Sequence, residues 1–378
     1  MNQQQFSSSH IPELDRFWAV VPAGGVGTRL WPLSRAAAPK FLHDLTGSGQ
    51  TLIRATYDRL HPIAGDKVMV VTGEAHRDAV CDQLSAVAQD NVILEPEPKD
   101  SGAAIGLAAA LLYERDPEAI MGSFAADQVI GPDDVFRASV VEAIATAATH
   151  KIVTIGIKPT YPSTGFGYIR QGEKLMIDGA PSAYKVDKFV EKPAAEVAQR
   201  YVESGKHFWN AGMFVAPVKL LLQHLQANEP ELYDGVTAIA KATEAGQAEQ
   251  AMAEIWPGLP KIAIDYAVAE PAAEAGDVAV IPGDFIWDDV GDFAAIARLN
   301  PAADESGVTV IGETPRVYAD DANGVVVTDT SRVIALIGVE DIVVVDTPDA
   351  LLVTTTEHAQ SVKHAVESIK AHGDDDVL

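Results

Sequence analysis

The chain has 378 residues, of which 47% are hydrophobic and 22% charged, a composition and length that suit a folded protein of two to three domains. Acidic residues number 54 against 28 basic ones, and the net charge of −26 argues against general affinity for nucleic acid or an anionic membrane. The longest apolar run, Ala103–Tyr113, is shorter than the roughly 20 residues that span a bilayer. Residues 1–14 lack the basic and apolar regions of a signal peptide, and Cys81 is the single cysteine, so we expect a cytoplasmic protein.

The first part of the chain alternates between strand-like and helix-like segments. Residues 1–16 are polar, and we expect them to be flexible. Short apolar runs follow at 17–21, 68–72, 92–94, 120–124 and 152–157, with helical patterns between them at 51–60, 76–87 and 101–115. This alternation predicts an α/β fold with a Rossmann-like, mainly parallel sheet covered by helices on both faces.

Strands near 186–191 and 212–216, with helices near 194–204 and 219–227, extend this domain to residue 300. Beyond it, short β-rich runs follow at 308–312, 325–328, 333–338, 342–346 and 351–354. Their spacing predicts a second domain over residues 301–378, either a small sandwich or a β-solenoid. A terminal helix is expected at 357–370.

A glycine-rich loop follows the first predicted strand. Its sequence, Ala23-Gly24-Gly25-Val26-Gly27-Thr28-Arg29-Leu30, lets backbone amides approach a phosphate without obstruction by Cβ atoms. The loop lacks Walker A spacing, and Leu30 occupies the third glycine position of the dinucleotide pattern. On its own it is also compatible with a plain strand–helix connection.

Three basic residues follow this loop closely, in a chain with few of them: Arg29, Arg35 and Lys40. Proline-stiffened stretches at 31–34 and 39–42 would present Arg29 and Lys40 in fixed directions. For Arg35 we expect an ordinary solvated surface charge.

Residues 24–34, followed by Pro39-Lys40, resemble the signature of the sugar-phosphate nucleotidyltransferases, specifically the mannose-1-phosphate guanylyltransferase family. The resemblance continues through 95–96, 101–110, 126–127, 165–169, 189–193, 209–214, 264–267 and 287–291, covering 17–360. It implies a nucleotide-diphospho-sugar transferase fold with a C-terminal β-helix. It also implies transfer of GMP from GTP to α-D-mannose 1-phosphate, giving GDP-mannose and pyrophosphate. No isomerase domain follows, so the short, single-activity form is expected.

The resemblance also assigns roles to residues. Arg29, Lys40 and Asp127 would be catalytic, and Asp127 and Asp289 would hold Mg²⁺. Asp127 follows the apolar run 120–124, where phosphates would lie, and a carboxylate there needs a cation such as Mg²⁺. Asp288 competes with Asp289 for this role, and Gln128 stands where many relatives carry histidine. The nucleotide would be bound by Ala23, Gly24, Gly25, Gly27, Thr28, Arg29, Lys99 and Ser101.

The sugar phosphate would be bound by Gly167, Glu191, Lys192, Asn210 and Asp265. From the residues alone, Glu191-Lys192 is equally compatible with a surface ion pair of little energetic value, and Asp265 with a structural role. Asn210 would offer its amide to sugar hydroxyls. Lys99 stands where guanine-specific relatives carry arginine, and it lacks the planar fork of arginine.

A phosphate monoester is largely dianionic at neutral pH, so no catalytic histidine or serine is expected. Two alternatives stay open: the same chemistry with UTP or dTTP and glucose 1-phosphate, or a regulatory protein that binds a nucleotide sugar without turnover. The C-terminal domain is expected to support a homodimer.

Overall fold

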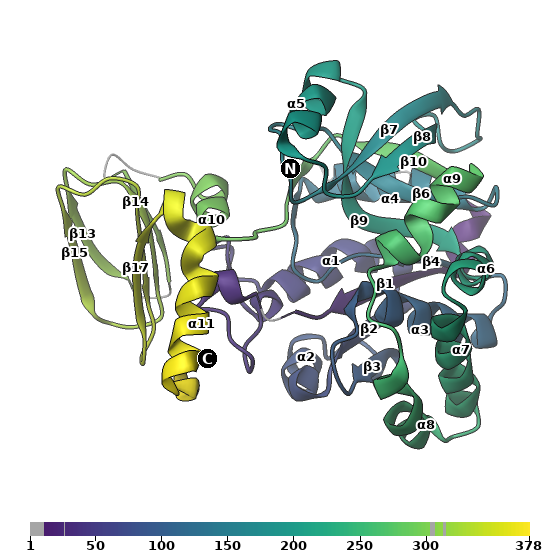
Figure 1. Cartoon of the computed structure of the whole chain (residues 1–378), viewed down its shortest axis with the longest axis horizontal. Coiled ribbons are helices and arrows are strands. Elements are labelled where there is room, and N and C mark those ends of the chain that lie inside the picture. Colours follow the sequence, from purple (N-terminus) through teal and green to yellow (C-terminus); the bar gives the residue numbers. More distant parts are fainter. Residues whose placement is uncertain (1–10, 26, 303–306, 313–314) are drawn as a thin grey trace, which may run out of the picture.

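A nine-stranded sheet forms the centre of the larger body in Figure 1. A computed structural model describes residues 11–25, 27–302, 307–312 and 315–378. The strand order is β3-β2-β1-β4-β9-β6-β10-β8-β7. These strands are β1 (Phe17–Ala23), β2 (Val68–Gly73), β3 (Val92–Glu95), β4 (Ile120–Ser123), β6 (Ile152–Ile157), β7 (Gly167–Lys174), β8 (Tyr184–Val190), β9 (His207–Pro217) and β10 (Val278–Gly283).

The sheet is mixed. Strands β3, β2, β1 and β4 are parallel, as predicted. Strand β9 runs antiparallel to both of its neighbours, β4 and β6, and β7 and β8 form an antiparallel pair at the edge. The predicted α/β class is confirmed, and the carboxyl ends of β1 to β4 create the sheet edge at which ligands of such folds bind.

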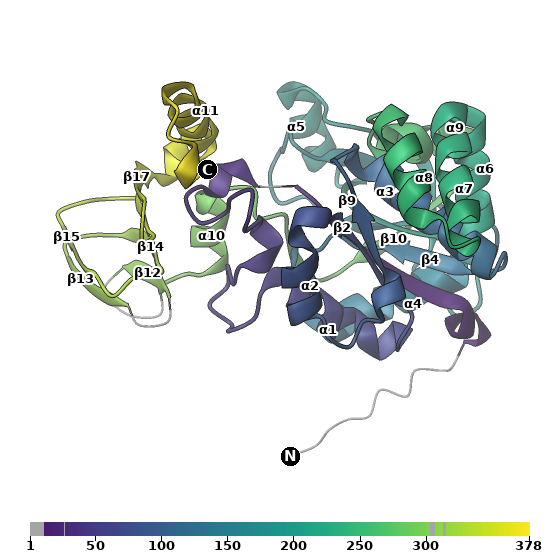
Figure 2. The ribbon, with the colours of Figure 1, turned by 90° about the horizontal axis from the view of Figure 1, so that it is seen from below.

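Helices cover both faces of the sheet, as Figure 2 shows. One face carries α1 (Leu52–Ala64), α2 (Arg77–Gln83) and α4 (Asp133–Ala147); the other carries α3 (Asp100–Arg115), α6 (Val218–Asn228), α7 (Pro230–Glu244), α8 (Ala248–Ile255) and α9 (Glu270–Ala275). Helix α5 (Ala195–Ser204) lies near β9. Strand β1 serves both cores because its side chains alternate: Ala19 and Val21 pack on the first face and Val20 on the second.

The C-terminal body is a β-solenoid and not a sandwich. Its parallel strands are β12 (Val308–Ile311), β14 (Gly324–Thr328) and β16 (Ile342–Asp346) on one side and β13 (Arg316–Asp320) and β15 (Val333–Ile337) on the other. Strand β17 (Leu351–Thr355) pairs antiparallel with β16, and α11 (Val362–His372) follows. The predicted β-solenoid-like fold is confirmed.

The two bodies share a hydrophobic cluster that we call the interdomain core. It combines residues from after β1, residues around α10 (Phe293–Leu299) and residues of the C-terminal strands and helix. Its buried members include Leu30, Trp31, Leu45, Leu52, Val290, Phe293, Ile296, Ile311, Val325, Val327, Val343, Val345 and Val362. In Figure 1 the purple segment after β1 accordingly lies between the large sheet and α11.

Arg35 departs from the expectation of an ordinary solvated charge. Its two terminal nitrogens donate to the two carboxylate oxygens of Asp349, each at 2.6 Å. Asp349 lies in the loop between β16 and β17, so this bidentate pair joins the two bodies. The sequence offered no pattern that pairs residues so far apart.

Both ends of the described chain contact the rest of the protein. Residues 1–10 of the predicted flexible N-terminus lie outside the described residues. Pro12–Arg16 form a 3-10 helix, and Ile11 and Leu14 pack against the core on the face of the sheet that carries α1 and α4. At the other end, the carbonyl of Val377 accepts a hydrogen bond of 2.7 Å from the Trp31 indole. In the part of the chain that the structure covers, no helix is both long and apolar enough to cross a membrane.

We propose that the domain boundary lies near residue 300 and expect truncation after Asn300 to give an unstable, poorly soluble protein. The cut removes the C-terminal half of the interdomain core and exposes Leu30, Trp31 and Phe293, which are buried in the full chain. Thermal unfolding and solubility of residues 1–300 against the full chain measure the effect. A well-folded, fully active fragment would contradict this expectation.

Candidate active site

The glycine-rich loop leads from the carboxyl end of β1 into a 3-10 helix at Thr28–Leu30. Gly27 has a φ of +72°, and a Cβ there would lie 3.0 Å from both Lys40 Cβ and Ser34 Oγ. A positive φ of this kind favours glycine. The Ser34 hydroxyl also donates to the Gly27 carbonyl at 2.8 Å. Gly27 therefore allows Lys40 to pack directly beneath the loop.

The remaining residues predicted for the nucleotide at this loop are mostly open to solvent. Gly24, Gly25, Thr28 and Arg29 are exposed or half-buried, while Ala23 is buried at the end of β1. Val26 lies outside the described residues. The accessible backbone and the Arg29 guanidinium are thus available to an anionic ligand.

Lys40 is the buried cation of the site. Its ammonium lies 2.8 Å from Asp127 Oδ2 and donates to the backbone carbonyl of Asp289, and only 7% of its side chain is exposed. Burial alone lowers the pKa of Lys40, but the carboxylates of Asp127 and Asp289 outweigh it and the net pKa is raised. The ammonium therefore stays charged.

A short antiparallel ribbon brings Asp127 and Asp289 together. Strand β5 (Val129–Gly131) pairs with β11 (Ile286–Asp288), with Val129 opposite Asp288. Asp127 lies just before β5 and Asp289 just after β11, so two aspartates far apart in sequence flank the same end of the ribbon. Lys40 contacts both at this point.

Asp289 is held close to other acidic groups. The pKa of Asp289 is raised to about 6, chiefly by burial and also by Asp127 and Asp288, while Lys40 and Arg29 oppose the rise. Asp288 itself is engaged elsewhere: its carboxylate accepts from the Val290 amide at 2.8 Å and from Arg298 at 2.6 Å. The structure therefore places Asp289, and not Asp288, with Lys40.

Asp127 and Asp289 could hold a magnesium ion. Two carboxylates offer the hard oxygen donors that Mg²⁺ prefers, with substrate phosphates and water completing its octahedron. The Lys40 ammonium already lies against these two residues, which shows that the site accepts positive charge. Within the described ranges, no cluster of three or more His, Cys, Asp or Glu side chains could bind a metal without such a substrate.

A second cluster contains the residues predicted for the sugar phosphate. Glu191, at the end of β8, pairs with Lys192 at 2.9 Å, and its side chain is only 8% exposed. A Cβ on Gly167 would collide with Glu191 Oε2, so glycine at 167 makes room for this carboxylate. Glu191 Oε2 has no hydrogen-bond partner among the described residues and is free to accept one from a ligand.

Asn210 of β9 connects Glu191's neighbourhood to Asp265. Its amide donates to Asp265 Oδ1 at 2.6 Å, while its carbonyl accepts from Thr154 and the Gly212 amide, each at 3.2 Å. Burial, and secondly Glu191, raises the pKa of Asp265 to about 6. The structure thus brings Asp265 into the cluster.

Two residues that support these two clusters, Thr154 and Glu270, were not predicted from the sequence, and a third, Gln128, was singled out only as a departure from relatives. Thr154 is a polar residue inside the apolar strand β6, a signal that could have revealed it. Glu270 accepts from the Glu191 amide at 3.3 Å. Gln128 is buried and donates to the Ala211 carbonyl at 3.0 Å. This hydrogen bond links Gln128, which follows Asp127, to Ala211, which follows Asn210. It therefore connects the two clusters.

Lys99 lies directly before α3, and Ser101 lies in its first turn. The Lys99 ammonium donates to the Pro257 carbonyl at 2.6 Å and pairs with Glu97 at 2.9 Å. Ser101 accepts from the Ile264 amide at 3.0 Å. Both side chains are therefore engaged with the segment at 257–264 that leads to Asp265.

Glu95 ends β3 as a buried carboxyl whose Oε1 lacks a hydrogen-bond partner in the described part of the chain. Burial raises its pKa from 4.5 to about 7. The folded state therefore binds this proton more tightly than the unfolded state, and the free energy of unfolding falls as pH rises between about 4.5 and 7.

We expect Glu95→Gln to remove part of this pH dependence, by at most about 3 kcal/mol between pH 5 and 8. Denaturant unfolding of the variant and the parent chain at both pH values measures it. Glu114→Gln, at an exposed position of α3, is the matched control. Parallel pH profiles for all three proteins would contradict the assignment of Glu95.

Comparison with known proteins identifies the families to which the two bodies are similar. Residues 18–306 match the family described as Nucleotidyl transferase, and residues 316–369 match the MannoseP isomerase/GMP-like beta-helix domain. The mannose-1-phosphate guanylyltransferase of Escherichia coli (strain K12) is 37% identical over 95% of this chain and 74% of its own length. That of Klebsiella pneumoniae is 35% identical over 93% of this chain and 73% of its own length.

A solved structure shows the same similarity in three dimensions. The crystal structure described as mannose-1-phosphate geranyltransferase from Thermus thermophilus has a TM-score of 0.80 and 30% identity, and the match covers 94% of this chain and 99% of that one. Both the catalytic sheet and the C-terminal solenoid are thus shared with a solved relative. The chain therefore belongs to the mannose-1-phosphate guanylyltransferase family of nucleotidyl transferases.

Proposed function

We propose that this enzyme transfers GMP from GTP to α-D-mannose 1-phosphate, releasing GDP-mannose and pyrophosphate. The observation that carries the proposal is the buried Lys40 between Asp127 and Asp289, directly beneath the glycine-rich loop. The names of the relatives, guanylyltransferases acting on mannose 1-phosphate, supply the substrate pair.

In the proposed reaction a phosphate oxygen of mannose 1-phosphate attacks the α-phosphorus of GTP. A new P–O bond forms, the bond between the α-phosphorus and the bridging oxygen breaks, and pyrophosphate leaves with that oxygen. The attacking phosphate is already largely dianionic near pH 7, so this chain need not supply a general base. Catalysis then depends on positioning and on stabilising the charge that develops on the phosphates.

Different residues of this chain bind the triphosphate and the sugar phosphate. The triphosphate is bound by Arg29, Lys40 and the backbone amides of Gly24, Gly25, Gly27 and Thr28. Asp127 and Asp289 would hold the metal. When bound, Mg²⁺ would neutralise charge on the phosphate oxygens. Lys40 keeps a positive charge beside the two aspartates and so orients them.

The sugar phosphate lies at the second cluster. Glu191 Oε2 and Asp265 accept hydrogen bonds from hexose hydroxyls, and Lys192, whose side chain is 57% exposed, meets the phosphate. Asn210 orients Asp265 through the bond of 2.6 Å between them. Lys99 and Ser101 fix the loop at the start of α3, against which the base binds.

Lys192→Ala is expected to raise the KM for mannose 1-phosphate about tenfold or more while changing the KM for GTP less than about threefold. Arg29→Ala is expected to raise the KM for GTP and to lower turnover, because the Arg29 guanidinium binds the triphosphate. Initial rates with each substrate varied separately distinguish the two. Equal rises in both Michaelis constants for both variants, with unchanged turnover, would show that the residues do not have separate roles.

The direct test of the substrate pair is pyrophosphate release over a grid of GTP, ATP, UTP and dTTP against mannose 1-phosphate and glucose 1-phosphate. The proposal predicts the highest kcat/KM for GTP with mannose 1-phosphate. A maximum with UTP or dTTP and glucose 1-phosphate would favour the alternative pair. Binding of GDP-mannose without release of pyrophosphate from any pair would favour a regulatory protein.

A further inference from the structure

The segment that carries Arg29 and Lys40 is anchored to the C-terminal domain as well as to the catalytic sheet. Leu30, Trp31 and Leu45 are buried in the interdomain core together with strands β14 and β16. The Trp31 indole also donates to the Val377 carbonyl at 2.7 Å. The position of the phosphate-binding segment therefore depends on residues at the far end of the chain.

We propose that the ion pair between Arg35 and Asp349 is a positioning pair for the nucleotide. It locks the segment from Arg29 to Lys40 against the C-terminal domain, so that this domain contributes to the nucleotide half of the active site. The inference rests on the proposed function for the identity of the nucleotide.

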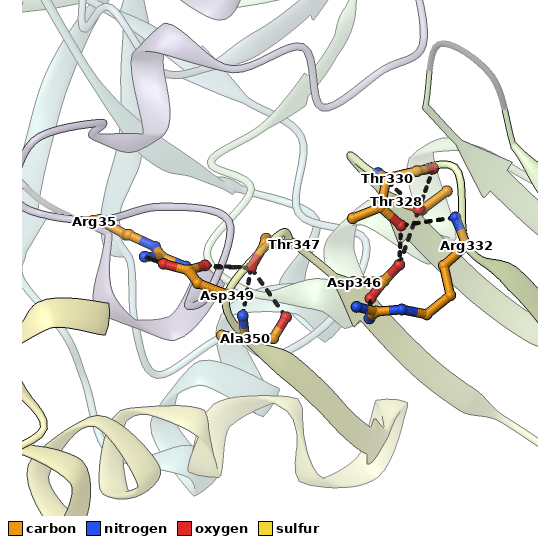
Figure 3. Close-up of polar contacts among 8 residues, drawn as sticks. All are labelled: Arg35, Thr328, Thr330, Arg332, Asp346, Thr347, Asp349 and Ala350. Atoms are coloured by element: carbon orange, nitrogen blue, oxygen red, sulfur yellow. Dashed lines mark hydrogen bonds and ion pairs between the residues drawn. The ribbon is translucent and has the colours of Figure 1, made fainter.

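The Arg35–Asp349 pair has the geometry of a bidentate, directional interaction. The two terminal nitrogens of Arg35 each donate to one oxygen of Asp349, and one also donates to Thr347 Oγ1 at 3.2 Å. The Asp349 carboxylate accepts the Thr347 hydroxyl at 3.0 Å. Figure 3 shows Arg35 facing this loop of the solenoid. Bidentate pairs of this kind fix orientation as well as distance.

Arg35 is connected tightly to Lys40. Its Nε donates to the Pro32 carbonyl at 2.9 Å, and the backbones of Arg35 and Ala38 exchange two hydrogen bonds that close a turn. Pro39, which has a fixed φ, then leads directly into Lys40. A displacement of the Arg35 side chain is therefore transmitted over a short, stiff path to the buried ammonium.

Apolar packing is incomplete next to the Arg35–Asp349 pair, so its hydrogen bonds help to hold the two bodies together there. An open groove of about 620 Å³ lies beside the pair, lined by Leu33, Arg35 and His43 on one side and by Val327 and Asp349 on the other, among others. Because apolar packing does not fill this space, the hydrogen bonds of Arg35 to Asp349 and Thr347 span its rim. Their loss removes one restraint on the position of the segment, and misplacement by about 1 Å can cost on the order of a hundredfold in rate.

The chain contains a matched control pair. Arg332 binds Asp346, which also accepts hydrogen bonds from Thr328 and Thr330. All four residues belong to the C-terminal solenoid, and in Figure 3 they form a cluster separate from Arg35 and Asp349. Arg332 therefore tests the effect of losing an arginine–aspartate pair from the same domain without touching the segment from Arg29 to Lys40.

Full-length Asp349→Ala, Arg35→Gln, the double variant and Arg332→Gln are compared with the parent chain. The proposal predicts a rise of about tenfold in the KM for GTP for either single variant, with the KM for mannose 1-phosphate within about twofold. The double variant should be no worse than the more affected single variant, because the two residues form one interaction. Asp349→Glu should recover part of the loss, and Arg332→Gln should alter the melting temperature without altering either KM.

Hydrogen exchange of residues 28–45 in the ligand-free proteins gives a readout that does not depend on turnover. Faster exchange there in Asp349→Ala, but not in Arg332→Gln, is the expected result. Unchanged exchange, or kinetic effects equal to those of Arg332→Gln, would overturn the positioning role. If the parent chain is inactive, the proposed function is wrong. Hydrogen exchange would still test the positioning role of the Arg35–Asp349 pair.

Discussion

Asp127→Asn and Asp289→Asn are each expected to lower turnover by at least about a thousandfold with little change in folding. Both substitutions preserve size and polarity but remove a negative charge from the end of the ribbon of β5 and β11, where Lys40 contacts the Asp127 carboxylate and the Asp289 backbone carbonyl. Burial and neighbouring carboxylates already raise the pKa of Asp289 to about 6, so losing a charge here relieves repulsion in the ligand-free protein. We therefore expect a loss of turnover and not a loss of folding stability.

Asp288→Asn is the matched control. Its carboxylate binds Arg298 and the Val290 amide, so we expect a loss of stability with turnover within about tenfold of the parent chain. Turnover as a function of magnesium concentration measures all three variants. If Asp288→Asn is the inactive variant, the assignment of Asp289 is wrong by one residue, and if magnesium has no effect on the parent chain, the assignment of the metal is wrong.

Lys40→Met should also abolish most turnover, by about a hundredfold or more, and should destabilise the protein by about 1–3 kcal/mol. The substitution retains the apolar stem but leaves Asp127 without the ammonium 2.8 Å away. Kinetics and denaturant unfolding measure the two effects.

Adding Asp127→Asn to Lys40→Met separates the structural effect from the catalytic one. The double variant should regain stability, because the uncompensated carboxylate is gone, but not turnover. Lys158→Met, at an exposed position, is the control and should change neither. Near-parental turnover in Lys40→Met would contradict a role for this ammonium at the phosphates.

Much of the fold follows from local patterns. The apolar runs that became β1, β2, β4 and β6 are strong signals because both of their faces are buried. Strand β7 was missed since its second half is polar and largely exposed, and β5 and β11 are too short to show any period. The antiparallel direction of β9 depends on long-range pairing that no local pattern encodes.

The candidate site, like the fold, could be predicted from the sequence only in part. Its residue types could be named from motifs, but the contacts that organise it could not. Asp127 and Asp289 meet only through the pairing of Val129 with Asp288. Gln128 gains its role from a carbonyl on β9, and Arg35 gains its role from a loop of the solenoid. In each case the partner lies far away in sequence, and only the folded chain identifies it.

Label transfer from GTP carrying radioactive phosphorus at the α position, in the presence of mannose 1-phosphate and magnesium, tests the central claim most directly. We expect the label to appear in GDP-mannose, with one unlabelled pyrophosphate released for each molecule formed, and we expect both to stop when mannose 1-phosphate is omitted. Label recovered as GMP or GDP, or release of pyrophosphate that does not require the sugar phosphate, would contradict it.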